Sequence, residues 1–170
     1  EVLGLTTRSQ LAGALADGRL HKPRHNRYCL ADLEGTMRAV ARTGGTASHL
    51  SAAQEFGWKL KHDPLRPCVT LPRSARKPRG PYELHWADLS ERELRRNVTS
   101  RTRTVIDCAR TYDFDVALCV ADSAMREGII DRDDLLVAAA RGPGPGARRP
   151  CGSQRRRPTC GPIRSRPAST

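Results

Sequence analysis

The sequence predicts an α+β fold made of three parts. Near the N-terminus a short helix is followed at once by a basic hairpin, and this pair predicts a partial winged helix over residues 1–32. Residues 33–141 show helical and strand-like apolar patterns, which predict a small mixed α/β domain. Residues 142–170 hold mainly Pro, Gly, Arg, Ser and Thr, with Ile163 as their one large apolar side chain, which predicts a disordered basic tail.

The first predicted helix begins after Thr6 or Thr7 and ends at Gly18. Either threonine can cap it, because a hydroxyl at that position accepts a hydrogen bond from an amide of the first turn. Leu11 and Leu15 fall near one face of this helix. We therefore expect a short helix that packs on one side and presents polar residues on the other.

A basic hairpin is predicted directly after this helix. Residues 19–22 form one strand, residues 23–26 a turn that begins with proline, and residues 27–30 the return strand. A helix that can enter a major groove, beside a basic hairpin, is the recognition half of a winged helix.

Side chains of this helix and hairpin are candidate contacts to double-stranded DNA. Those at the helix start can reach base edges, since arginine pairs with guanine and glutamine with adenine in bidentate fashion. Those of the hairpin can contact phosphates, which adds affinity without sequence information. The alternative is a solvated basic hairpin with no partner. The candidates are Thr6, Thr7, Arg8, Gln10, Arg19, Lys22, Arg24, His25 and Arg27.

The remaining elements follow from periodicity and from Gly, Pro and capping residues. Thr46 or Ser48 is expected to cap the second helix of the mixed domain, and Asp131 the last. The expected helices span residues 33–42, 50–56, 102–112, 114–126 and 132–140, and the expected strands 68–71 and 82–86, with 98–100 as a strand or extended piece and a short turn from Asp88 or Ser90. Expected inward-facing residues are Val105, Ile106 and Ala109, then Val116, Leu118, Cys119, Ala121 and Met125.

The formal net charge of +12 comes mostly from the end of the chain. Residues 141–170 contain eight Arg and no Lys, Asp or Glu, so 22 basic and 18 acidic residues remain elsewhere. The rest of the chain is therefore only mildly basic, and its positive charge gathers in the N-terminal stretch and at residues 73–79. Such clustering indicates a nucleic-acid partner better than the overall charge does.

Cysteine spacing and hydropathy exclude several classes of protein. No pair of the six cysteines has the C-x-x-C spacing of a structural zinc site. Cys108 and Cys119 lie in apolar helical patterns and are expected to be buried free thiols, which suits a reducing compartment. No stretch is long and apolar enough to span a membrane, and there is no signal peptide. We expect a cytoplasmic protein that uses no cofactor or metal and does not bind a membrane.

No residue pattern predicts catalysis. His49 and Ser51 are two apart on a helix and point in different directions, so His49 is expected to tie a helix start to a neighbouring strand. The aspartates at 131–134 lack the glycine and glutamate of a calcium loop. Asp107 and Asp122 are expected to pair with Arg103 and Arg126 one helical turn away. We expect that the chain is not an enzyme.

Several segments, in their order along residues 4–141, carry a family resemblance. They are GLTTR at 4–8, GRL at 18–20, NRY at 26–28, SHLSAA at 48–53, VTLPR at 69–73, VTS at 98–100, RTVID at 103–107 and ADSA at 121–124 with Gly128. This order resembles AbiEi-type antitoxin-like proteins of bacteria. In many of these a winged helix and a mixed α/β segment precede an endonuclease-like domain of the very-short-patch-repair type.

The chain departs from that family at both ends. Only residues 1–3 stand where earlier helices of a winged helix would lie, and the tail replaces the nuclease-like domain. A nuclease of that kind needs carboxylates to hold a metal ion, and the tail has no carboxylate side chain. We expect a chain truncated at both ends, with the tail a frame-shifted remnant; the other two reading frames beyond Gly142 would decide this.

The resemblance implies a DNA-binding antitoxin or transcription regulator of a type IV toxin-antitoxin system, with a cognate toxin protein as partner. The domains are then a partial winged helix at 1–32, an antitoxin-like domain at 33–141 and a basic tail at 142–170. One alternative is the inactive front portion of an endonuclease-like protein. Another is a protein-interaction module whose basic loop at 72–81 binds an acidic partner.

Overall fold

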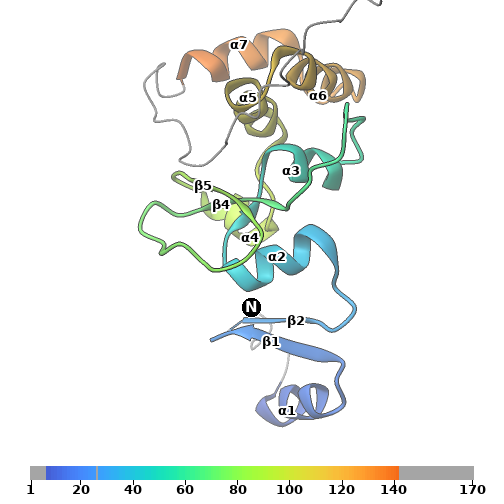
Figure 1. The fold of residues 1–170 in the computed structure, drawn as a ribbon, viewed down its shortest axis with the longest axis vertical. Helices are drawn as coiled ribbons and strands as arrows, with labels where there is room; N and C mark the ends of the chain where they lie inside the picture. Colours follow the sequence, from blue (N-terminus) through green and yellow to red (C-terminus); the bar gives the residue numbers. More distant parts are fainter. Residues whose placement is uncertain (1–6, 26, 142–170) are drawn as a thin grey trace, which may run out of the picture.

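The computed structural model describes residues 7–25 and 27–141 and confirms the mixed α+β class. Figure 1 shows an elongated arrangement, with α1 and a hairpin at one end, a small sheet in the middle and α5 to α7 at the other end. The predicted tail at 142–170 lies outside the described residues. The elements are α1 (Arg8–Ala16), β1 (Leu20–Arg24), β2 (Arg27–Leu30), α2 (Gly35–Thr43), β3 (Thr46–Ala47), α3 (His49–Glu55), β4 (Cys68–Leu71), β5 (Glu83–Trp86), α4 (Glu91–Arg96), α5 (Arg101–Thr111), α6 (Phe114–Arg126) and α7 (Arg132–Arg141).

The larger sheet has three short strands in the order β3-β4-β5. Strand β3 runs antiparallel to β4, whereas β5 runs parallel to it. The predicted extended piece at 98–100 lies beside β3, because Val98 bridges to Ala47 and the Thr99 amide donates to the Ala47 carbonyl at 2.9 Å. The sheet is therefore mixed, with β5 at one edge.

The sequence does not predict β3. Either Thr46 or Ser48 is expected to cap the following helix. Ser48 does occupy the cap position of α3, without a side-chain bond to the helix. Thr46 instead pairs with Thr70 of β4. A strand of two residues is too short for an alternating pattern to show, so its position depends on contacts with distant segments.

The sheet separates two apolar clusters, because alternate residues of a strand point to opposite faces. On one face, Ala39 and Val40 of α2 pack with Val69 and Leu71 of β4. On the other face, Cys68 of β4 belongs to a cluster that α3, α5 and α6 complete. Its other buried members are Leu50, Ala53, Trp58, Val105, Cys108, Val116, Val120, Ala124 and Ile130.

The C-terminal helices have the expected bounds to within one residue, but some of their side chains face differently. Ala109 of α5 is exposed, and Cys108 takes the buried position beside Val105. On α6, Leu118 and Met125 are exposed rather than packed, and Cys119 is only half-buried. The expectation of a buried thiol is thus confirmed for Cys108 and wrong for Cys119.

Local interactions in these helices follow the predictions. The Asp131 carboxylate accepts a hydrogen bond from the Asp134 amide at 2.7 Å and so caps α7. Arg103 pairs with Asp107 at 3.3 Å, and Arg126 with Asp122 at 3.1 Å. Across residues 7–25 and 27–141, none of the helices combines the length and the apolar character that crossing a membrane requires.

Candidate nucleic-acid interface

Helix α1 begins with a reciprocal capping arrangement. The Thr7 hydroxyl accepts a hydrogen bond from the Gln10 amide at 3.3 Å, and the Gln10 side-chain oxygen accepts one from the Thr7 amide at 2.9 Å. These bonds satisfy two amides that have no partner within the helix. The sequence leaves the choice of cap between Thr6 and Thr7 open, and in the structure Thr7 caps the helix. Thr6 lies outside the described residues.

The rest of α1 is attached by very little apolar surface. Leu11 is its one buried residue, and Leu15 is half-buried. Arg8 and Gln10 are exposed, as predicted for side chains that could meet a partner. The Gln10 oxygen is engaged by the cap, so bidentate pairing of this amide with adenine would first require the capping bonds to break.

The hairpin β1–β2 is held against α2 by two arginines. Arg24 Nη1 donates to the Thr43 carbonyl at 2.7 Å, and Arg27 Nη2 donates to the Gly44 carbonyl at 3.4 Å. These carbonyls belong to the last residue of α2 and to its cap, where the helix leaves acceptors without partners and carries partial negative charge. Arg24 and Arg27 therefore have a structural role that sequence reasoning missed, since nothing local indicates the partner helix.

The other cations of the hairpin have weaker partners. Arg19 pairs with Asp17 at 2.9 Å, and both side chains are largely exposed. The Lys22 ammonium lies 5.8 Å from the centre of the Tyr28 ring. His25 is exposed at the turn. Such contacts in water contribute little free energy, so these side chains can turn to an external phosphate at small cost.

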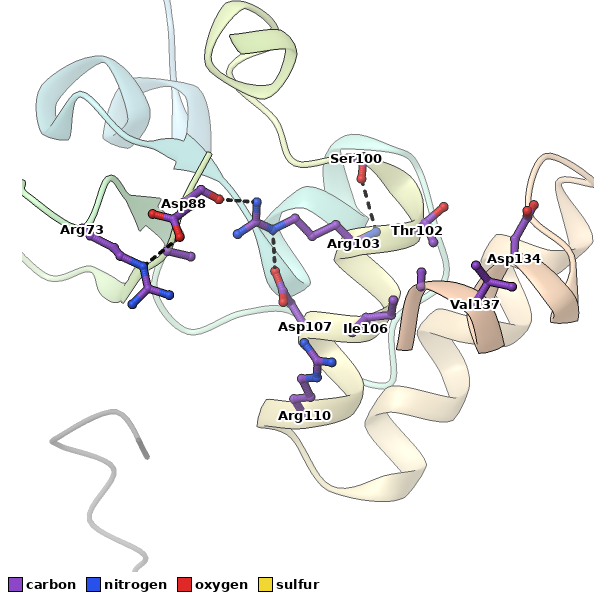
Figure 2. A pocket seen from close by; sticks show the side chains of 12 residues that line it. Arg73, Asp88, Ser100, Thr102, Arg103, Ile106, Asp107, Arg110, Asp134 and Val137 are labelled. Atoms are coloured by element: carbon purple, nitrogen blue, oxygen red, sulfur yellow. Dashed lines mark hydrogen bonds and ion pairs between the residues drawn. The ribbon is translucent and has the colours of Figure 1, made fainter. Parts of the chain in front are cut away.

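A groove between α5 and α7 has a volume of about 600 Å³. Figure 2 shows Arg103 among the residues that line it, donating to the Asp107 carboxylate and to the Asp88 carbonyl. Arg103 also pairs with Glu93 at 3.1 Å, and Arg73 pairs with Asp88 at 3.0 Å. The arginines of the groove thus already meet acidic or carbonyl oxygens, which makes it a poor anion site.

His49 connects the start of α3 to the neighbouring strand β5, as predicted. The His49 ring stacks on His85 of β5 at 3.7 Å between centroids, and its Nδ1 lies 3.0 Å from the Ser48 hydroxyl. The Ser51 hydroxyl accepts a hydrogen bond from the Cys68 amide at 2.9 Å, so it bonds to β4 and not to His49. No grouping of three His, Cys, Asp or Glu suited to a metal ion occurs in the described part of the chain.

The stability of the protein is expected to fall in mild acid because of His49. Burial lowers the pKa of His49 well below its usual 6.5, and the charges of His85 and Arg103 lower it further. The unfolded chain then binds a proton that the folded protein does not, so this contribution is complete above pH 6.5 and is lost as the pH falls toward the folded pKa. Urea unfolding at about pH 8 and about pH 5 measures the difference.

A His49→Asn variant is the matched control for this effect. Asparagine tolerates the left-handed backbone at this position, where φ is 51°, and does not titrate. We expect its unfolding free energy to depend less on pH between these two values. An unchanged pH dependence would assign the effect to other groups.

No protein-family model and no curated protein matches this chain.

Proposed function

We propose that the chain binds double-stranded DNA through α1 and the hairpin β1–β2, as an antitoxin-like transcription regulator. The main support is the way in which α1 and the hairpin are attached to the rest of the fold. Helix α1 carries exposed polar residues at its N-terminal end and buries only Leu11, while Arg24 and Arg27 hold the hairpin on α2. An exposed helix beside a basic hairpin that is held in place is suited to binding in a groove of DNA.

In this proposal α1 and the hairpin make different contacts with DNA. Arg8, in the first turn of α1, pairs with a guanine edge or a phosphate, helped by the partial positive charge of the helix N-terminus. Arg19, Lys22 and His25 contact the phosphate backbone and set the register of the protein on the duplex. Gln10 keeps its capping bonds, and Arg24 and Arg27 act only by holding the hairpin.

Salt-dependent binding of the full chain to duplex DNA tests this proposal. Phosphate contacts from three cationic side chains, those of Arg8, Arg19 and Lys22, predict that affinity falls about 40-fold between about 50 and about 200 mM salt, in addition to any contribution from the arginines of the tail. Arg8→Ala and Lys22→Ala should each weaken binding and reduce the slope of log affinity against log salt by about 1. Fluorescence anisotropy with a labelled duplex gives both quantities.

Two further variants show whether the losses of affinity come from the particular side chains that are removed. Arg92→Ala removes an exposed arginine from α4, outside α1 and the hairpin, and should leave the slope unchanged. Arg24→Ala should lower both the thermal stability and the affinity, because it detaches the hairpin. If Arg8→Ala and Lys22→Ala bound DNA as the parent does, the interface would be elsewhere, for instance in the tail.

The regulatory part of the proposal concerns the operon of a toxin. The protein would occupy its own promoter and reduce transcription of an adjacent toxin gene. A reporter fused to the upstream region of the gene is expected to be repressed by the parent chain and less so by Arg8→Ala. Equal reporter expression with and without the protein would contradict this regulatory role, but it would not contradict DNA binding.

A further inference from the structure

The loop between β4 and β5 carries four cations and no carboxylate. Its residues 72–81, here called the basic loop, read PRSARKPRGP, and all four basic side chains are exposed. Arg73 pairs with Asp88 at 3.0 Å. The other three cations, Arg76, Lys77 and Arg79, form no ion pair with any of residues 7–25 and 27–141. Within that part of the chain, their charges are therefore not matched by a carboxylate.

Hydrogen bonds and prolines restrict the backbone of the basic loop. The Ala75 amide donates to the Pro72 carbonyl at 2.9 Å, and the Trp86 indole N–H donates to the Ala75 carbonyl at 3.0 Å. Three prolines fix φ along these ten residues. Because the loop is already ordered, a partner that binds its cations loses little affinity to ordering of the backbone.

The basic loop and the hairpin β1–β2 both border α2. Ala75 of the loop and Tyr82, directly after it, pack against the apolar cluster that α2 shares with β4. The hairpin is held on the C-terminal end of the same helix through Arg24 and Arg27. Two basic segments that are about fifty residues apart in the sequence therefore meet the same helix.

A short path of contacts connects the turn of the hairpin with the start of the basic loop. The two arginines of the hairpin reach the carbonyls of Thr43 and Gly44. The next residue, Gly45, lies against Leu71, which directly precedes the loop, with an added Cβ 2.8 Å from Leu71 Cδ2. In Figure 1, β1 ends on the left of the view, and the loop between β4 and β5 projects to the same side.

We propose that the basic loop is a second phosphate-contacting element, which binds the same DNA duplex as the hairpin through Arg76, Lys77 and Arg79. This inference rests on the proposed function and extends it to a segment outside α1 and the hairpin. A duplex presents phosphates along its whole length, so basic elements on one side of a protein can engage it together. DNA is favoured over an acidic protein segment because the loop and the hairpin form one extended basic surface.

Salt-dependent binding of the full chain to a labelled duplex, followed by fluorescence anisotropy, tests this proposal. The triple variant Arg76→Ala/Lys77→Ala/Arg79→Ala, here called the loop variant, should bind more weakly than the parent. The slope of log affinity against log salt is expected to fall by about 2 to 3, because each lost phosphate contact removes about 0.9. Circular dichroism should show this variant folded, since all three side chains are exposed.

A second triple variant controls for the loss of net charge. Arg110→Ala/Arg126→Ala/Arg132→Ala removes the same charge from exposed positions on α5, α6 and α7, which lie at the other end of the molecule. Its slope should stay close to that of the parent. Equal decreases of the slope in both triple variants would overturn the proposal, because they would reflect net charge and not a contact of the loop.

The variants Arg8→Ala and Lys22→Ala, measured in the same assay, separate this inference from the proposed function. If they weaken binding and the loop variant binds as the parent does, the inference is overturned and the proposed function stands. If only the loop variant weakens binding, the loop contacts DNA, and the proposed role of α1 and the hairpin is overturned. A parent without affinity for duplex DNA at low salt would overturn both.

A labelled poly-glutamate peptide is the probe for an acidic protein partner. The loop variant is expected to lose more affinity for the duplex than for this peptide. A loss of peptide binding with unchanged binding to the duplex would overturn the proposal and assign the loop to an acidic protein.

Discussion

Replacing Arg103 by alanine is expected to lower the free energy of unfolding by about 3 kcal/mol, because its loss leaves two largely buried carboxylates without their paired cation. Arg103 donates to Glu93 at 3.1 Å and to Asp107 at 3.3 Å, and it also donates to the Asp88 carbonyl at 2.8 Å. The side chains of Arg103, Glu93 and Asp107 are 24%, 9% and 21% exposed, so water screens these pairs only weakly. This one guanidinium thus connects α4, α5 and the segment after β5.

Urea unfolding of Arg103→Ala and of a control, Arg95→Ala, measures this difference. Arg95 pairs with Glu91 within α4, but both side chains are largely exposed, so its loss should change stability by less than about 0.5 kcal/mol. Arg103→Lys keeps the charge but cannot make three separate bonds in the same geometry, and should recover only part of the loss. Equal losses of unfolding free energy in Arg103→Ala and Arg95→Ala would show that the ion pairs of Arg103 contribute no more to stability than an exposed pair does.

Replacing Gly45 by alanine is expected to destabilise the protein by about 3 kcal/mol, because no space exists for a methyl group. An added Cβ would lie 2.5 Å from Val69 Cγ1 and 2.6 Å from the Thr70 carbonyl oxygen. The oxygen belongs to the backbone of β4, the central strand, which cannot move without disturbing both of its neighbours. Thermal unfolding followed by circular dichroism should show a transition at a much lower temperature.

Gly13→Ala provides the contrast to this substitution. Gly13 lies inside α1 with nothing within 4 Å of an added Cβ, so alanine there should strengthen the helix by about 0.5–1 kcal/mol. A loss of similar size in both variants would indicate that both results reflect a general intolerance of the chain and not the close approach to β4.

The parts of the fold that depend on local chemistry could be predicted from the sequence. Thr7 and Asp131 cap their helices as expected, and Gly44 ends α2 with φ at 77°, a conformation that glycine adopts without strain. The hairpin also forms in the expected segment, with Leu20 opposite Leu30. The predicted turn at 23–26 is wrong in its bounds, because β1 continues through Pro23 to Arg24, which pairs with Arg27. Each of these features is decided within a few residues of the chain.

What could not be predicted depends on partners far away in the sequence. The pairing of Thr46 with Thr70 and the attachment of Arg24 to the end of α2 both join segments about twenty residues apart, and no local pattern indicates them. The prediction that Leu118 and Met125 face inward is wrong for another reason. Helix α6 has two apolar faces, and periodicity alone cannot tell which one meets the core.

The elongated arrangement in Figure 1 has a consequence for the two ends of the molecule. The basic hairpin lies at one end, and helices α5 to α7 lie at the other. If the hairpin contacts DNA as proposed, these helices stand away from the duplex and their outer surface stays open to solvent.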